Sequence, residues 1–457
     1  MDRRRFLKTT GQGAIASTIA GAVGRSGFAG EPAANPGSAP GPQPGYTLPG
    51  HLPKKLSIGM FIWNWVTMAT PGEPYHDLEK AVAGLPERGF NAVRVEAGLN
   101  WCFQMDGRPR GEMEFGPWIP GYRDNLTSVN VRGGGRHDVL KRLTLLMELA
   151  KRYGVYVILT SWEYQDSSWL VADPKIRAEV MAVAQNQRLM QMARQYDRLL
   201  RMLKDKGLDR NIAYVEVHNE PDASLLPQGE KGKRLHQEAI AFLRDAHPDI
   251  LLSGDYCSHN PAIVPDNVQV YDQHTYVADL YWSVLYNQTI FHKDFNPAEP
   301  RKLKLLDRLL KDKFVPYAEF LKPAQNVREM WRGIDWLYYN LDNERFDQWI
   351  LEEYARREAD MNQKAARIFE GDAREAQRRN VPAVCDEGGY FYPPLGSKFE
   401  LRPPGTGMFE LQVDLAIKHG YWGMMPTTYC GAEHPTWDNV PWLRAINGRF
   451  QSGTLRA

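Results

Sequence analysis

Residues 215–221 read Val-Glu-Val-His-Asn-Glu-Pro, and this stretch decides the fold that we predict for the 457-residue chain. It continues a run of strand-forming residues that begins at Ile212 and stops at a turn signal. Residues 383–389, Ala-Val-Cys-Asp-Glu-Gly-Gly, have the same form, and the paired glycines let the backbone turn sharply after the strand. Each stretch therefore displays one carboxyl group, that of Glu220 or Glu387, at the exit of a β-strand.

Short runs of β-branched or aromatic residues alternate with amphipathic stretches from residue 56 onward. This alternation is typical of repeated βα units. The predicted strands are residues 56–64, 91–97, 155–161, 212–219, 250–255, 268–274, 381–386 and 421–427. Because eight parallel strands close a barrel, we predict an α/β fold, a (β/α)8 TIM barrel over residues 54–457.

The amphipathic stretches are predicted to be helices. After the second strand, apolar residues recur at helical spacing and Gly154 follows where a left-handed cap is needed; they are Val139, Leu143, Leu146, Met147 and Ala150. After the seventh strand the same pattern precedes Gly420, with Met408, Leu411 and Leu415.

Two segments exceed the minimal βα unit. Residues 101–135, after the second strand, are rich in Gly and Pro, and residues 279–380, after the sixth, are charged and largely helical. Loops after the strands carry the binding site in such barrels, so we expect these insertions to shape the cleft. They would close one end of it into an exo-acting pocket or rim an open groove. For residues 279–380, a solvated helical appendage on the flank is the alternative.

The N-terminus has the features of an export signal. Asp2 precedes three arginines and Phe-Leu-Lys, and a weakly apolar stretch at 13–23 leads to small residues at 27–29. This order resembles a twin-arginine signal, although Ser or Thr is usual at the place of Asp2. We expect cleavage after Ala29 and a periplasmic or extracellular protein; a basic disordered tail is the alternative. Residues 30–53, dense in Pro, Gly, Ala and Ser, are predicted to be a flexible linker.

The charge balance argues against nucleic acid or an anionic membrane as a partner. The net charge is +1, and removing the net +4 of residues 1–29 leaves −3 for the mature chain. No later segment reaches the roughly 18 apolar residues of a membrane span. The four cysteines lack the paired spacings of a zinc site. We expect free buried thiols, with a bridge between Cys385 and Cys430 as the alternative.

The two glutamates predict a specific chemistry. Glu220 follows the fourth predicted strand and Glu387 the seventh, which lie across the mouth of a closed barrel from each other. Cleavage of a glycosidic bond requires two carboxyl groups, because one protonates the leaving oxygen while the other attacks or stabilises the sugar carbon. The alternative for each glutamate is a solvated side chain at a strand end.

These motifs resemble glycoside hydrolase clan A, and most closely its family 5 of cellulases and mannanases. The matching stretches are residues 89–94 (Gly-Phe-Asn-Ala-Val-Arg), 216–221 (Glu-Val-His-Asn-Glu-Pro), 274–276 (His-Thr-Tyr) and 387–388 (Glu-Gly). The resemblance follows the element order over residues 56–457. It implies a glycosidase that cleaves β-glycosidic bonds with retention by double displacement, on a carbohydrate substrate and without metal or organic cofactor.

The resemblance also implies roles by position. They are Glu220 as acid/base, Glu387 as nucleophile, Asn219 as ligand of the 2-hydroxyl, His274 as a sugar contact, and Arg94 and Tyr276 as partners of Glu387. A cation and a hydroxyl donor lower the pKa of a carboxyl group, whereas a partly desolvated glutamate keeps its proton. The alternatives are that Arg94 pairs with Glu96 or Glu216, and that His274 is a packed histidine.

The chain departs from the family pattern at two strand ends. The family usually ends its third strand with His and its eighth with Trp, whereas here residues 161–163 read Ser-Trp-Glu and residues 427–429 read Thr-Thr-Tyr. Other aromatic rings would then contact the sugar, and the candidates are Trp162, Tyr429, Trp63 and Trp65. A non-catalytic carbohydrate-binding barrel is therefore one alternative function. A metal-dependent hydrolase that uses His218, His274 and Glu220 is another.

Overall fold

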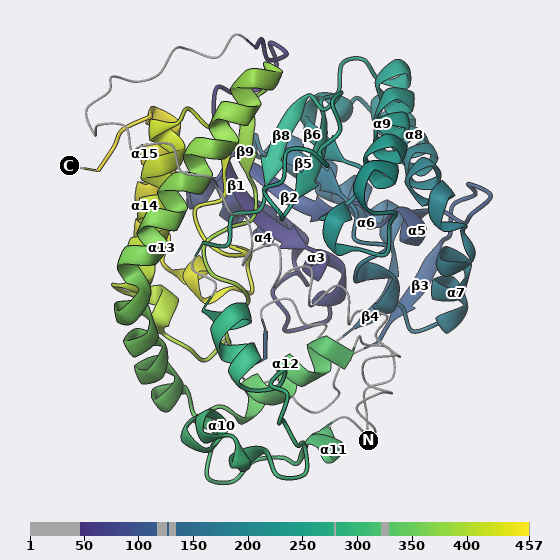
Figure 1. Ribbon diagram of the computed structural model, residues 1–457. Coiled ribbons are helices and arrows are strands. Elements are labelled where there is room, and N and C mark those ends of the chain that lie inside the picture. The colour runs from purple at the N-terminus through teal and green to yellow at the C-terminus, as the bar shows by residue number, and fades with distance from the viewer. Residues whose placement is uncertain (1–45, 117–125, 128–133, 278–279, 321–328, 457) are drawn as a thin grey trace.

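The computed structural model describes residues 46–116, 126–127, 134–277, 280–320 and 329–456. Eight parallel strands of this part of the chain close into a barrel (Figure 1). In order around the barrel they are β1 (Leu56–Ile62), β2 (Ala92–Glu96), β5 (Tyr156–Thr160), β6 (Ile212–Glu216), β7 (Leu252–Tyr256), β8 (Val270–Gln273), β9 (Ala383–Cys385) and β10 (Gly423–Met424). The predicted (β/α)8 barrel is confirmed, and every predicted strand overlaps one of these.

Helices pack around the outside of the barrel. Those that follow strands are α4 (Leu78–Glu87), α6 (Val139–Arg152), α8 (Arg188–Asp205), α9 (Gly229–Ala246), α13 (Asn343–Arg379), α14 (Gly405–Lys418) and α15 (Val440–Ser452). Residues 257–269, between β7 and β8, are all described and contain no helix. Both predicted helix ends are confirmed, because Gly154 and Gly420 follow α6 and α14 with φ of 68° and 74°.

The insertion after β2 contains a hairpin as well as loops. Strand β3 (Glu112–Phe115) pairs antiparallel with β4 (Gly135–Asp138), and α5 (Leu99–Cys102) precedes them. Thr127, farther along the insertion, forms a β-bridge with Pro394 in the loop after β9. This insertion therefore contacts the loop after β9, and its role in shaping the cleft stays a prediction. Two other short helices, α3 (Asn64–Thr67) and α7 (Pro174–Ala182), follow β1 and β5.

The insertion after β8 is helical, as predicted. It contains a π-helical turn (Tyr281–Tyr286), α10 (Lys304–Leu309), α11 (Tyr317–Phe320) and α12 (Glu329–Asn340), and it continues into the 37-residue helix α13. The later part of α13 packs on β8 and β9 and serves as a barrel helix, whereas α10, α11 and α12 lie together beyond one end of the strands (Figure 1). The insertion is therefore continuous with the barrel wall.

Almost every residue of the eight barrel strands is buried, as expected for a parallel barrel covered by helices. The cysteines at 102, 257, 385 and 430 are all free thiols. A bridge between Cys385 and Cys430 does not form because the first thiol donates to the Glu387 carbonyl oxygen at 3.3 Å while the second accepts from Thr436 at 3.5 Å.

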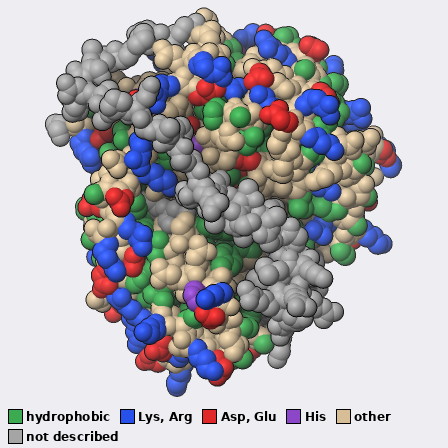
Figure 2. Space-filling view, viewed as in Figure 1, with side chains coloured by type: hydrophobic (Ala, Val, Ile, Leu, Met, Phe, Trp, Pro, Cys, Tyr) green, Lys and Arg blue, Asp and Glu red, His purple; other side chains and the backbone are tan. Residues whose placement is uncertain are grey.

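Acidic and basic side chains are interspersed over the surface, and Figure 2 shows this mixture on one face. In the part of the chain described above, no helix combines the length and apolar character needed to cross a bilayer. The predicted signal segment at 1–29 and most of the linker at 30–53 lie outside the described residues.

Candidate active site

Glu220 lies at the mouth of the barrel just beyond β6. Its backbone is left-handed, with φ 41° and ψ 63°, and Pro221 begins a short 3-10 turn directly after it. This conformation is strained for a residue that carries a Cβ, and such strain is concentrated where a functional side chain is held in one direction. The Glu220 side chain is 13% exposed, so it is accessible from the open end of the barrel.

Glu387 lies at the mouth just beyond β9. Gly389 follows with φ 75°, and a Cβ on it would lie 2.4 Å from the ring of Phe409, so only glycine fits this predicted turn. Glu387 itself is 3% exposed. Its carboxylate is displayed at the strand exit, as predicted, but Arg94 of β2 and tyrosines from the loops after β8 and β10 cover it.

The two carboxyl groups point into the same space. One oxygen of Glu220, one oxygen of Glu387 and a ring nitrogen of His274 all lie within 4.8 Å of one another. Although the glutamates are 167 positions apart in the sequence, the barrel brings them to one reacting centre.

His218 takes no part in this centre. Its Nδ1 lies 2.5 Å from the carbonyl oxygen of Asn219, and its Nε2 accepts from the Tyr164 amide at 3.2 Å. Among the described residues, no group of three His, Cys, Asp or Glu side chains that comes within reach of one cation includes His218. The alternative of a metal site formed by His218, His274 and Glu220 is therefore wrong, because backbone contacts hold His218 elsewhere.

Arg94 projects from β2 into the barrel and is completely buried. Its nitrogens contact Glu387, Glu216 (2.6 Å), Asp255 (2.8 Å), Asp386 (2.9 Å) and the amide oxygen of Asn219 (2.8 Å). Burial alone would lower the pKa of Arg94, but the four carboxyl groups raise it well above its ordinary value. Both predicted partners, Glu387 and Glu216, therefore bind the same guanidinium. The other candidate, Glu96, instead accepts from the amides of Gly98 (2.7 Å) and Trp162 (2.9 Å).

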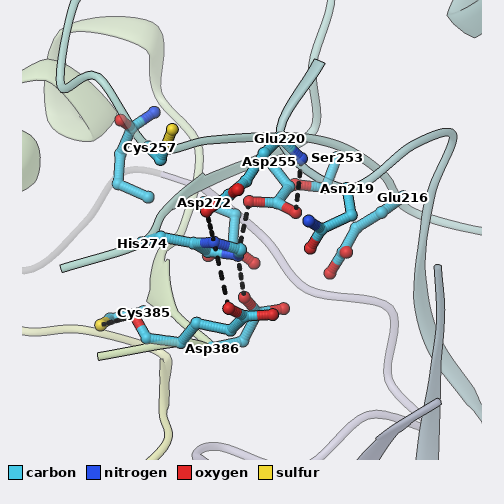
Figure 3. Close-up of polar contacts among 12 residues, drawn as sticks. Glu216, Asn219, Glu220, Ser253, Asp255, Cys257, Asp272, His274, Cys385 and Asp386 are labelled. Atoms are coloured by element: carbon cyan, nitrogen blue, oxygen red, sulfur yellow. Dashed lines mark hydrogen bonds and ion pairs between the residues drawn. The ribbon is translucent and has the colours of Figure 1, made fainter. Parts of the chain in front are cut away.

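His274, just beyond β8, lies between two pairs of acids, and Figure 3 shows it beside Glu220, Asp255 and Asp386. Its Nδ1 is 2.7 Å from Glu220 and 3.4 Å from Glu387, and its Nε2 is 2.7 Å from Asp255 and 3.3 Å from Asp386. Burial lowers the pKa of His274, but the charges of Asp255 and Glu387 outweigh burial and raise it well above its ordinary value. The ring is therefore an imidazolium at neutral pH.

Two tyrosines donate to Glu387. The hydroxyl of Tyr276 binds its Oε2, and the hydroxyl of Tyr429 lies 3.0 Å from the same oxygen. The Tyr429 ring also stacks on Tyr392, with centroids 4.3 Å apart. Tyr429 is therefore placed as a hydrogen-bond donor, while the contact with sugar that we expected of it stays a prediction.

Asn219 and Glu220 are connected by a residue that the sequence did not suggest. Gln165, in the loop after β5, donates from Nε2 to Glu220 Oε2 at 3.0 Å and accepts from Asn219 Nδ2 at 2.7 Å. The amide of Asn219, expected to bind a sugar hydroxyl, is thus held by Gln165 and Arg94 in the free protein.

Glu220 does not keep its own proton in the free protein. Burial raises its pKa, but the hydrogen bond and charge of His274, with the hydrogen bond from Gln165, outweigh burial and lower the pKa below its ordinary value. The expectation from partial desolvation is therefore wrong, because a cation lies 2.7 Å away. Nδ1 of His274 is therefore placed to donate a hydrogen bond to Glu220.

The tryptophans proposed as sugar contacts are buried. Trp63 and Trp65 have no exposed surface, so they offer no face to a sugar. Trp162 is 2% exposed, and its ring is occupied by the Arg94 guanidinium at 4.7 Å and by the edge of Trp63 at 5.8 Å. Contact of Trp162 with substrate stays a prediction.

Several acids inside the barrel support the site, and of these only Glu216 was singled out from the sequence, as a possible partner of Arg94. Burial raises the pKa of Glu216 and of Asp272 well above the ordinary value, and raises that of Asp255 to about 6. Asp386 has a lowered pKa because Arg94 and His274 outweigh its burial. The sequence does carry a signal for these acids, because they are polar residues within otherwise apolar strands. Alternate residues of a barrel strand point inward, so an acid at such a position is expected inside the barrel.

A barrel with two glutamates meeting at the exits of its fourth and seventh strands defines the class of barrel glycoside hydrolases. The family model described as cellulase, glycosyl hydrolase family 5, matches residues 57–299, more than half of the chain. The chain belongs to glycosyl hydrolase family 5, and the predicted resemblance is confirmed. No curated protein sequence matches it.

The chain is similar to several solved structures at low sequence identity. A Parabacteroides distasonis protein described as a glycoside hydrolase is 16% identical, with a TM-score of 0.62 over 89% of this chain and 96% of that one. A family 5 mannosidase from Rhizomucor miehei is 12% identical, with a TM-score of 0.46 over 88% and 94% of the two chains. An endo-β-1,4-mannanase from Thermotoga petrophila is 10% identical, with a TM-score of 0.47 over 90% and 80%.

Proposed function

We propose that this glycoside hydrolase cleaves β-glycosidic bonds with net retention, by double displacement. The observation that carries the proposal is the separation of Glu220 and Glu387, whose nearest oxygens lie within 4.8 Å. Retaining glycosidases hold their carboxyl groups about 5 to 5.5 Å apart, whereas inverting ones need about 6.5 to 9.5 Å to admit a water molecule. The short separation supports retention.

Glu387 is the nucleophile in this proposal. Arg94 binds one of its oxygens, and Tyr276 and Tyr429 bind the other, so three donors fix the direction of the carboxylate. Glu387 forms an ester bond with the anomeric carbon as the bond from that carbon to the leaving oxygen breaks. Water then attacks the same carbon and releases the carboxylate, so two inversions give retention.

Glu220 is the acid/base, and His274 supplies its proton. A bound sugar displaces water, which disfavours the ion pair of His274 and Glu220 relative to its neutral form. The proton on Nδ1 then passes over 2.7 Å to Glu220 and on to the leaving oxygen. In the second step Glu220 takes a proton from the attacking water. Asn219 lies between Arg94 and Gln165, in a position that supports its proposed role at the 2-hydroxyl.

The substrate class in this proposal is a β-linked glucan or mannan, or an oligosaccharide derived from one.

We also propose that the chain is exported through its twin-arginine-type N-terminus. N-terminal sequencing of the exported protein tests this export. Cleavage after Ala29 is expected, and an intact N-terminus on protein in the periplasm or medium contradicts it.

Azide rescue tests both carboxyl roles on an activated aryl β-glycoside. Glu387→Ala should abolish hydrolysis, and azide should restore turnover with an α-glycosyl azide as product, because a single displacement inverts the anomeric carbon. Glu220→Ala should instead give the β-glycosyl azide, because azide then attacks the covalent intermediate. Unchanged hydrolysis by Glu387→Ala would falsify the assignment of Glu387 as the nucleophile. Glycan binding without turnover by the wild type would favour the non-catalytic barrel.

A further inference from the structure

A hydrogen bond joins two loops from different sides of the barrel mouth. Trp331 Nε1, in α12, donates to Asp166 Oδ1, in the loop after β5, at 2.9 Å. Helix α12 belongs to the insertion after β8, three positions away from β5 around the barrel. Asp166 and Trp331 are 5% and 3% exposed, so no solvent-filled gap separates them. The mouth is therefore bridged by packed protein between these loops.

Each end of this bridge leads to one of the two glutamates. Next to Asp166, Gln165 donates to Glu220 at 3.0 Å. The acid/base side of the centre is thus attached directly to the loop that Trp331 binds.

On the other side, aromatic rings continue from Trp331 to Glu387. Trp331 packs edge-on against Tyr392 with centroids 4.8 Å apart, and Tyr392 stacks on Tyr429 at 4.3 Å. Tyr429 donates to Glu387 at 3.0 Å. We name this continuous row the cross-wall; its members are Gln165, Asp166, Trp331, Tyr392 and Tyr429.

A second layer supports the cross-wall. Asp335 lies four residues after Trp331, so both point from the same face of α12. Its carboxylate accepts from the amide of Thr127 at 3.5 Å, and Thr127 forms a β-bridge with Pro394 in the loop after β9. One face of α12 therefore meets the loops after both β2 and β5. Insertions from opposite sides of the barrel meet over the same end of the cleft.

We infer that the cross-wall closes one end of the cleft, so that the enzyme acts on chain ends and releases terminal units instead of cutting internal bonds. An internal bond requires the sugar chain to continue past the two glutamates in both directions. The row of buried contacts from Glu220 to Glu387 occupies one of those directions. This inference rests on the proposed glycosidase function and adds the chain end as the substrate feature that is recognised.

The test uses the purified wild-type enzyme and the sugar whose aryl β-glycosides it hydrolyses. With the corresponding polysaccharide, reducing sugar should accumulate while the viscosity stays constant. With oligosaccharides of defined length and a fluorophore at the reducing end, products should shorten by one constant unit from one end. Rapid loss of viscosity with a spread of internal fragments would overturn the inference.

Variants of the cross-wall give a second readout. Trp331→Ala and Asp166→Ala should open the closed end, so viscosity loss per reducing end should increase while hydrolysis of the aryl glycoside persists. Asp166→Asn keeps an acceptor for the indole N–H and should retain the wild-type pattern. Trp442→Ala removes an indole that binds Glu410 at 3.1 Å on the outer helices, and it controls for general loss of packing.

The outcomes separate this inference from the proposed function. Internal cleavage by the wild type with retained anomeric configuration refutes the closed end and leaves the glycosidase intact. Absence of any hydrolysis, with aryl glycosides as well as polymers, refutes the function itself. An unchanged product pattern in Trp331→Ala or Asp166→Ala, with a native Tm, also counts against the closed end.

Discussion

Tyr276 and Tyr429 place their hydroxyl oxygens 2.6 Å apart and both bind the same oxygen of Glu387. Residue 429 lies at the strand end where the family usually has tryptophan. The ring at this position is packed face to face on Tyr392, so its polar tip points to the carboxylate. The departure from the family pattern therefore adds a second donor to the proposed nucleophile.

Removing only this hydroxyl measures its contribution. Tyr429→Phe keeps the stacked ring and removes a hydrogen bond to a charged group, which is worth about 1.5 to 3 kcal/mol. We expect kcat/KM for an aryl β-glycoside to fall by roughly 10- to 100-fold, with little change in Tm. Tyr421→Phe, which removes a buried hydroxyl bound to the Phe369 carbonyl oxygen at 3.3 Å, is the matched control. Equal effects of both variants would show that the hydroxyl is only structural.

The pH dependence of kcat/KM reports the proton shared by His274 and Glu220. The proton is lost as the pH rises through the pKa of His274, which lies well above its ordinary value of 6.5. The alkaline limb should therefore lie above pH 6.5. Gln165→Glu adds a negative charge beside Glu220 and should move this limb to higher pH, whereas Gln165→Met adds no charge and should not. A wild-type limb in the acidic range of Glu220 alone would exclude His274 as the proton source.

The buried acids predict that stability decreases as the pH rises. Burial, then the charge of Asp386, raises the pKa of Asp272 above its ordinary 3.8. The folded chain thus binds a proton that the unfolded chain releases, and each pH unit between these two pKa values costs about 1.4 kcal/mol of folding free energy.

Asp272→Asn should therefore flatten the decline in the free energy of unfolding between acidic and alkaline pH, measured by urea denaturation. Asp266→Asn is the control, because Lys233 lowers the pKa of this exposed acid and its contribution is lost only as the pH falls. Parallel pH profiles for wild type and Asp272→Asn would contradict the raised pKa.

Arg94 is the cation on which the buried acids depend. Arg94→Lys keeps a positive charge but cannot contact four carboxyl groups in a fixed planar geometry. Leaving buried charges unpaired typically costs about 3 to 5 kcal/mol, so Tm should fall and kcat/KM should be nearly abolished. Arg142→Lys is the matched control, because Arg142 binds only the carbonyl oxygens of Trp65 (2.7 Å) and Tyr75 (2.5 Å). A similar loss in both variants would mean that the acids do not need Arg94.

The barrel could be predicted because each strand is local in sequence and buried on both faces. Strand lengths were less predictable: residues 421–427 were expected to form a strand, but only Gly423 and Met424 pair with their neighbours. Pairing depends on the adjacent strands, which local propensity does not describe. The use of the later part of α13 as a barrel helix also escaped prediction, because no proline inside the helix marks where the insertion ends and the barrel helix begins.

The two glutamates could be predicted because each directly follows a strand. Gln165, Asp255 and Trp331 could not, because their importance comes from contacts across the barrel between residues far apart in the chain. The protonation of Glu220 was predicted in the wrong direction for the same reason. Its burial follows from the strand end, but the compensating charge of His274 depends on the closed geometry.

Helix α13 runs without interruption for 37 residues from the insertion to the barrel wall (Figure 1). It contains no proline, and a helix without such a break resists sharp bending. Helix α12, which carries Trp331 of the cross-wall, is followed after two residues by α13, and α13 packs on β8 and β9 of the barrel. With one end of the cleft closed, a released sugar leaves through the same opening by which the polymer end enters. Product release from that opening must therefore precede the next turnover.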